Sequence, residues 1–252
     1  MANALSIFRR TVIGLRDPSE APTSLEIAVR FAHSVDSELV GIFVEDAELF
    51  EWSDSATIRH VSVRQAETAP RRHLADEFSE AAAVARGRLF AIESRLGIRV
   101  GFSIERAAAA SLDLPGIEPS DLLVVLEPAN PMARRSYPFS AIVNAVARTD
   151  LSVLFVPSNV AERSGPVMGI VGGRHTRAAE LTGAVAHALA TKSVLVLPQP
   201  DAPDAPPDVL GTGTERLIVL ERGRFPHETS ETFVTLASER RVPILLIGSA
   251  KK

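Results

Sequence analysis

Short aliphatic runs alternate with helical patterns along the first 156 residues, and this order constrains the fold more than any other feature. The runs occupy residues 11–15, 39–44, 98–104, 122–126 and 153–156. The run at residues 122–126 is continuously apolar, which is typical of a parallel strand covered on both faces. Strands that alternate with helices predict an α/β protein with a doubly wound, mostly parallel sheet.

Apolar residues at steps of three and four identify the helices between these strands. Thr23 and Glu26 form a capping box that opens the first helix. The pattern at residues 74–96 predicts a long helix, and Gly97 is a typical residue to end it.

Three further segments connect the strands in this interpretation. Residues 45–73 mix charged and polar residues with a few aromatics, so we expect a long connection there rather than a core element. A short Ala-rich helical turn is expected from Arg106. After a proline-containing loop, a helix is expected from Ser140 to residue 148.

The pattern begins again after residue 165, which indicates an internal repeat. The strand at residues 12–14 matches residues 167–169, and residues 39–40 match residues 194–195, both at an offset of 155. The later strands match at offsets of 95 and 91. The offset falls from 155 to 95, so the second copy lacks 60 residues, which correspond to the long connection, the second helix and the third strand.

The chain is therefore predicted to contain two Rossmann-like units, with the second one shortened. The full unit covers residues 1–158 and the shortened unit covers residues 165–252. A polar hinge joins them, and a proline-rich stretch at residues 198–207 replaces the missing part of the second unit.

Composition excludes several classes of protein. The chain has no cysteine, which removes disulfides, thiolate metal sites and thiol nucleophiles. A net charge of −4 argues against a nucleic-acid partner. There is no signal-peptide pattern and no apolar run of about 20 residues. We therefore expect a cytoplasmic protein without membrane insertion.

The repeated order of elements resembles the universal stress protein family in tandem form. The segments Asp17-Pro18-Ser19 after the first strand and Phe43-Val44-Glu45-Asp46 at the end of the second carry this resemblance. It implies an α/β/α sandwich with a nucleotide-binding type of fold and a role in the stress response. Members that bind ATP have Gly-x-x-Gly, nine residues, and Gly followed by Ser or Thr after the fourth strand.

The glycine motif is missing from this sequence. Its three glycine positions fall on Leu126, Ala129 and Phe139, and only Ser140 remains. Glycines let backbone amides approach a phosphate, so their loss removes the loop that would hold one. ATP and AMP are therefore not favoured as cofactors.

The remainder of the site that the resemblance implies consists of Asp17, Val44 and Ser140, with added charge from Arg134 and Arg135. Each polar residue has a structural alternative. An Asp before proline is commonly a turn residue, a Ser at a helix start is commonly a cap, and loop arginines are commonly solvated.

A second candidate for anion binding is the turn at residues 172–176, which joins a strand to a helix in the shortened unit. It lacks the third glycine of a dinucleotide fingerprint.

No catalytic or metal-binding pattern is found in the sequence. The six histidines lie singly, and there is no Gly-x-Ser-x-Gly nucleophile turn. Glu45 and Asp46 are neighbours on a strand end, so their side chains point in opposite directions and do not form an acid/base pair. The sequence predicts a protein that is not an enzyme.

Three functions remain open at this point. The first is a non-catalytic stress or signalling regulator with a protein partner, which would use Phe50 and Trp52 as anchors unless these fold back onto the sheet edge. The second is a nucleotide or anion sensor with a degenerate site near Asp17 and Ser140. The third is an enzyme of another nucleotide-using α/β family.

Assembly within the chain is also predicted. Universal stress proteins commonly dimerise through their fifth strands, so the resemblance implies that residues 152–156 pair with residues 244–247 as an intrachain pseudo-dimer. A further homodimer of the whole chain is left open.

Overall fold

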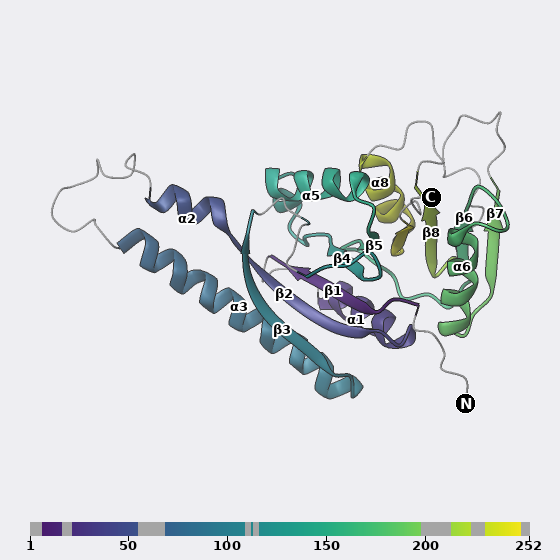
Figure 1. Cartoon of the computed structure of the whole chain (residues 1–252), viewed down its shortest axis with the longest axis horizontal. Helices are drawn as coiled ribbons and strands as arrows, with labels where there is room; N and C mark the ends of the chain where they lie inside the picture. Colours follow the sequence, from purple (N-terminus) through teal and green to yellow (C-terminus); the bar gives the residue numbers. More distant parts are fainter. Residues whose placement is uncertain are drawn as a thin grey trace.

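A computed structural model of the chain describes residues 7–16, 22–54, 69–108, 112, 116–197, 213–222 and 230–247. These residues form one sheet of nine strands in the order β3-β2-β1-β4-β5-β9-β8-β6-β7, with helices on both faces (Figure 1). The predicted α/β class with a mostly parallel sheet is confirmed.

The first half of the sheet contains five parallel strands. They are β1 (Arg10–Leu15), β2 (Glu38–Asp46), β3 (Val100–Ala107), β4 (Leu122–Leu126) and β5 (Ser152–Val156). The helices of this half are α1 (Pro22–Ser34), α2 (Ala47–Asp54), α3 (Ala69–Leu96), α4 (Pro131–Arg134) and α5 (Tyr137–Arg148).

The second half adds four strands that are parallel to one another. They are β6 (Val167–Ile170), β7 (Ser193–Val196), β8 (Leu217–Glu221) and β9 (Ile244–Ile247), accompanied by α6 (Arg177–Ala188) and α8 (Ser230–Arg240). The halves join where β5 and β9 run antiparallel, with Leu154 opposite Leu245. These are the strands that the resemblance implies as partners. Because one sheet runs through both halves, the division at residues 158–165 into two units stays a prediction.

Two hydrophobic cores lie on opposite faces of the sheet, because successive strand residues point to opposite sides. The first core packs α1, α3 and α6 against one face, to which β4 contributes Leu122, Val124 and Leu126. The second packs α5 and α8 against the other face, to which β4 contributes Leu123 and Val125. Every side chain of β4 is therefore buried, which explains its unbroken apolar sequence.

The sheet register corrects the offsets between the two copies. Leu122 and Leu217 face the same core at the predicted offset of 95. Thr11 lies beside Leu122 and Val167 lies beside Leu217, so the first strands correspond at 167 − 11 = 156. Leu39 lies beside Thr11 and Ser193 beside Val167, so the second strands correspond at 193 − 39 = 154. A shift of one residue turns a side chain to the other face, so the single offset of 155 is wrong by one at both strands.

Among the described residues, the strand that corresponds to β2 in the second half has only one neighbouring strand. In the first half, β2 pairs with β3 and lies beneath α3. The equivalent strand, β7, is the last strand of the sheet formed by the described residues. Its Val194 and Leu195 and the following Leu197 are exposed apolar side chains.

Three segments differ from the expected boundaries. Two of them involve the region that follows β2 and the end of β3. The connection at residues 45–73 contains α2 and the start of α3, two helical parts that its polar composition did not indicate. Arg106 belongs to β3, which pairs with β2 as far as Ala107, and not to a helical turn. The predicted end of α3 is confirmed, since Gly97 follows it with a positive φ of 68°.

The third difference is the start of α5, which begins at Tyr137 rather than at Ser140. Ser136 occupies the N-cap position, and Pro138 lies in the first turn. Proline is tolerated there because the first helical N–H groups have no partner within the helix.

Candidate functional site

The predicted ligand site lies at the carboxyl ends of β1, β2 and β4, and its residues do not share one environment. Asp17 lies outside the described residues. Val44 is buried in the core beneath α5. Ser140 is exposed within the first turns of α5, where its backbone N–H donates to Ser136 O. Ser140 is therefore not a helix cap.

The loop after β4 is closed by one of the two predicted arginines. The guanidinium of Arg134 donates from Nε to Pro128 O at 2.9 Å and from a terminal nitrogen to Ala129 O at 3.1 Å. It also lies 3.8 Å from Glu127 Oε1. Arg134 thus holds its own loop, whereas Arg135 is exposed.

The positions of the missing glycines do not fit a phosphate loop. Leu126 is buried in one core and Phe139 in the other, while Ala129 is exposed. The Phe139 ring lies 6.5 Å from that of Phe155. Backbone approach to a phosphate needs open space at these positions, and two of the three carry buried side chains. The residues present therefore do not fit ATP bound in the manner of the glycine motif.

The turn at residues 172–176 already holds an anion from the chain itself. Gly172 N donates to Glu221 Oε2 at 2.8 Å. Thr176 Oγ1 accepts from Ala179 N at 3.3 Å and caps α6. A carboxylate thus lies where a small anion was expected, so the turn has a structural role.

Glu127 is a polar residue that sequence reasoning missed. It is 3% exposed, and its carboxylate accepts from both the N–H and the hydroxyl of Ser158, at 2.8 and 2.9 Å. It therefore ties the end of β4 to the chain that leaves β5. The only signal for this role in the sequence is that a charged residue directly follows an apolar strand.

Arg222 occupies the equivalent position in the second half, at 127 + 95 = 222. Its guanidinium donates to Val146 O and, at 3.1 Å, to Leu151 O. Both carbonyls belong to the segment around the end of α5 in the first half. The two charged residues at this place in the repeat connect parts of the chain rather than facing a ligand.

A buried ion cluster lies at the opposite ends of these strands, where β1 and β4 begin. The carboxylate of Asp121 is fully buried and accepts from Arg9 Nε at 3.0 Å, Arg10 at 2.7 Å and Glu118 N at 3.0 Å. Burial alone would raise the pKa of Asp121, but the hydrogen bonds from Arg9 and Arg10 outweigh it and lower the pKa below its ordinary value. This cluster fixes the starts of β1 and β4.

Phe50 is not a free anchor for a partner. It is buried, its ring stacks on that of Phe78 at 5.4 Å, and the Arg106 guanidinium lies 3.9 Å from its centroid. Arg106 in turn pairs with Glu45 at 2.9 Å. The alternative interpretation, that this aromatic folds back onto the sheet edge, is correct for Phe50. The side chain of Trp52 lies outside the described part of the structure.

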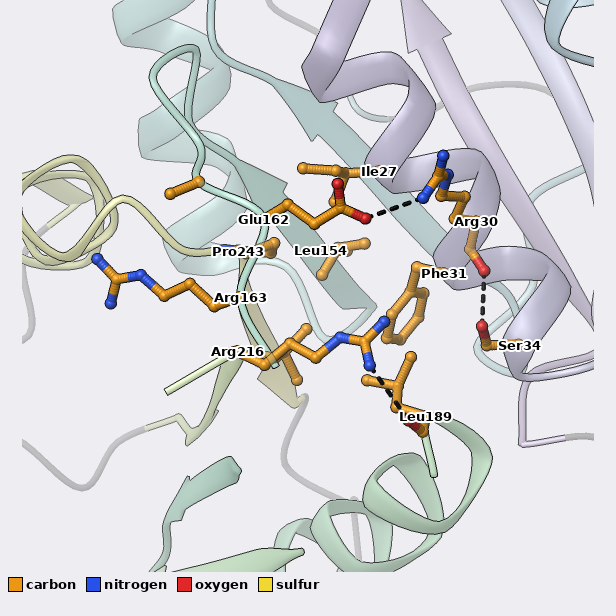
Figure 2. A pocket seen from close by; sticks show the side chains of 12 residues that line it. Ile27, Arg30, Phe31, Ser34, Leu154, Glu162, Arg163, Leu189, Arg216 and Pro243 are labelled. Atoms are coloured by element: carbon orange, nitrogen blue, oxygen red, sulfur yellow. Dashed lines mark hydrogen bonds and ion pairs between the residues drawn. The ribbon is translucent and has the colours of Figure 1, made fainter. Parts of the chain in front are cut away.

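A small cavity of about 60 Å³ lies between the two halves (Figure 2). Its apolar walls come from both halves and include Phe31 and Leu154 on one side and Leu217 on the other. At its rim Arg30 pairs with Glu162 at 2.9 Å. On the other side of the cavity, Arg216 donates to Leu189 O at 3.1 Å. These polar groups bond to the chain itself, and the cavity has room for only a few water molecules.

The hinge between the halves is tied down along its length. Ser24 Oγ donates to Pro157 O at 2.9 Å, and Ala161 N donates to Arg241 O at 2.8 Å. At the end of the hinge, Arg216 N donates to Pro166 O at 2.9 Å. The segment that was expected to be a polar hinge is thus held by contacts to both halves.

Within the described residues, no group of three or more His, Asp or Glu side chains is arranged to hold a metal ion. Of the helices that the structure describes, none combines the length and apolar character needed to cross a membrane.

Comparison with known proteins identifies which solved structures have a similar fold. No family model and no curated protein matches the chain. Among solved structures, it is similar to a universal stress protein from Archaeoglobus fulgidus DSM 4304, with a TM-score of 0.57 and 10% identity over 95% of this chain and 97% of that one. It is also similar to a functionally unknown protein from Pseudomonas aeruginosa PAO1, with a TM-score of 0.52 and 13% identity over 98% of this chain and 94% of that one. At these identities the likeness establishes the fold, which is that of universal stress proteins.

Proposed function

We propose that this chain, which has the fold of universal stress proteins, is a non-catalytic stress-response or signalling regulator of the cytoplasm that acts through protein contacts. The fold supports a role in the stress response. The lack of a recognisable catalytic pattern in the sequence supports a role without chemistry.

One observation carries the proposal, namely the closed loop after β4. The Arg134 guanidinium bonds to Pro128 O and Ala129 O, and Leu126 and Phe139 fill positions where ATP-binding members have glycine. A nucleotide phosphate at this place would have to displace the arginine and approach two buried apolar side chains. Both changes oppose binding.

Calorimetric titration with ATP, ADP and AMP tests this proposal. We expect no binding tighter than ~100 µM, which corresponds to about 5.5 kcal/mol. The same samples incubated with ATP should release no phosphate above the rate of buffer alone.

The alternative is a nucleotide or anion sensor at a degenerate site near Asp17 and Ser140. Binding tighter than ~100 µM that is lost in Asp17→Ala and in Ser140→Ala would establish this alternative and overturn the first proposal. Asp76→Ala is the matched control, because Asp76 is an exposed carboxylate on α3. Steady phosphate release would overturn the non-catalytic role.

A further inference from the structure

A groove of about 720 Å³ runs between the outer side of α3 and the edge strand β3. Both elements lie at the periphery of the molecule, far from the second half (Figure 1). Small residues of α3 form much of the groove, and Phe102 and Ile104 of β3 form the opposite wall. The α3 residues are Ser79, Ala82, Ala83, Arg86, Gly87 and Phe90.

The surface around this groove contains exposed apolar side chains. Ile104 is 49% exposed and Val84 is 41% exposed. Ala83 and Gly87 are also exposed. Exposed apolar and small side chains therefore lie among the charged ones on this part of α3.

Within the described residues, no neighbouring atom requires glycine at position 87. A Cβ built at this position would meet no atom within 4 Å. Glycine in a helix interior is unfavourable relative to alanine, and close approach of another backbone is one of the usual reasons to find it. The open space above Gly87 indicates that such an approach comes from outside the chain.

The charges along α3 identify the occupant. In the middle of α3, at residues 76–88, Asp76, Glu77 and Glu80 lie on the N-terminal side of Ala83, and Arg86 and Arg88 lie on the C-terminal side. These five charged side chains are all exposed. If a second α3 packs antiparallel, the basic residues of each helix lie against the acidic residues of the other. A parallel helix would oppose like charges.

We propose that this groove binds α3 of a second copy of the chain, antiparallel and related by a two-fold axis at Ala83. Glu80 and Arg86 lie on either side of Ala83 at equal spacing, so Glu80 of one copy lies level with Arg86 of the other. A two-fold axis makes the interface self-complementary and closes the assembly as a dimer. The second helix also covers the outer side of β3, which is the first strand of the sheet among the described residues. This inference does not depend on the proposed function, since it involves no ligand and no other protein.

Sedimentation velocity of the full chain between about 1 and 100 µM tests the proposal, because dimers of moderate affinity form in this range. We expect a reversible dimer for the native chain. Ala83→Glu should be monomeric, because it places two carboxylates face to face at the axis. Ala91→Glu is the control, since Ala91 is an exposed residue of the same helix outside the groove, and it should remain dimeric.

A charge exchange tests the antiparallel arrangement of the two helices. Glu80→Arg and Arg86→Glu should each weaken the dimer about tenfold or more, as the loss of a close charge pair does. The double variant Glu80→Arg/Arg86→Glu should recover the dimer. Both positions are exposed, so the variants are expected to fold, which circular dichroism checks.

Three results would overturn the proposal. They are a native chain that stays monomeric at the highest concentration, a dimer that Ala83→Glu leaves intact, and a double variant that does not recover the dimer.

Discussion

Replacing Gly165 by alanine tests how closely the segment between the halves packs on the second half. A Cβ at Gly165 would lie 2.7 Å from the carbonyl carbon of Thr214 and still closer to its oxygen. Ordinary contacts of a Cβ begin near 3.4 Å. Since both partners are backbone, no side chain can rotate away, and the two segments must separate by more than about 1 Å, which overpacked sites force only at a cost in stability.

Such a separation breaks contacts that hold the two segments. Thr191 Oγ1 donates to Gly165 O at 2.9 Å, and Arg216 N donates to Pro166 O at 2.9 Å. Each bond contributes about 1 kcal/mol, and overpacking adds about 1–3 kcal/mol. We therefore expect Gly165→Ala to lower the free energy of unfolding by about 3–5 kcal/mol, of which the two hydrogen bonds account for about 2.

Urea unfolding followed by circular dichroism measures this change, and Gly87→Ala is the matched control. In a single copy of the chain, alanine at position 87 meets no described atom within 4 Å and improves helix propensity, so at concentrations where the chain is monomeric it should raise the free energy of unfolding by about 0.5–1 kcal/mol. The same substitution is thus expected to lower the free energy of unfolding at position 165 and to raise it at position 87. A loss below about 1 kcal/mol for Gly165→Ala, no larger than that of an average substitution, would refute the close packing of the two segments.

Further predictions concern the ion cluster, the buried aromatic and the closed loop. Asp121→Asn should cost about 1–3 kcal/mol at pH 7 in urea unfolding. Because the folded pKa of Asp121 lies below its ordinary 3.8, this stabilisation is present above that value and is lost as the pH falls through the folded pKa, so stability curves of variant and native chain should converge in acid. Phe50→Ala should lower the free energy of unfolding by about 3 kcal/mol in urea, because its ring is buried. Loss of an exposed ring would cost much less. Arg134→Ala should speed amide hydrogen exchange at residues 128–135, and unchanged exchange there would contradict the closing role of its guanidinium.

Part of the fold could be predicted from local sequence because burial there leaves a local pattern. The strand β4 was predicted at its observed bounds, since all its side chains are buried and charged residues stand at either end. The start of α5 was predicted too late, because Pro138 is also typical of a loop although proline fits the first turn of a helix.

Other features depend on contacts between distant residues and have no local signal. Phe50 is buried by Phe78 and Arg106, which come from another helix and another strand. The offsets of the repeat followed matches between apolar runs in the sequence, whereas hydrogen bonding between strands sets the register. At the candidate site, the missing glycines are visible in the sequence, but the inward turn of Arg134 toward its own loop is not.

The pairing of β5 with β9 has consequences for how the protein behaves when it is diluted and for how its sequence can change in evolution. Both strands belong to one chain, so their effective concentration is about millimolar or above, whatever the protein concentration. Separate subunits that meet through such strands would come apart when diluted, whereas this seam persists. Each half can therefore lose or gain peripheral elements and still remain paired with the other half. The second half illustrates this, because β7 is the last strand of the described sheet, whereas the corresponding β2 has β3 beside it.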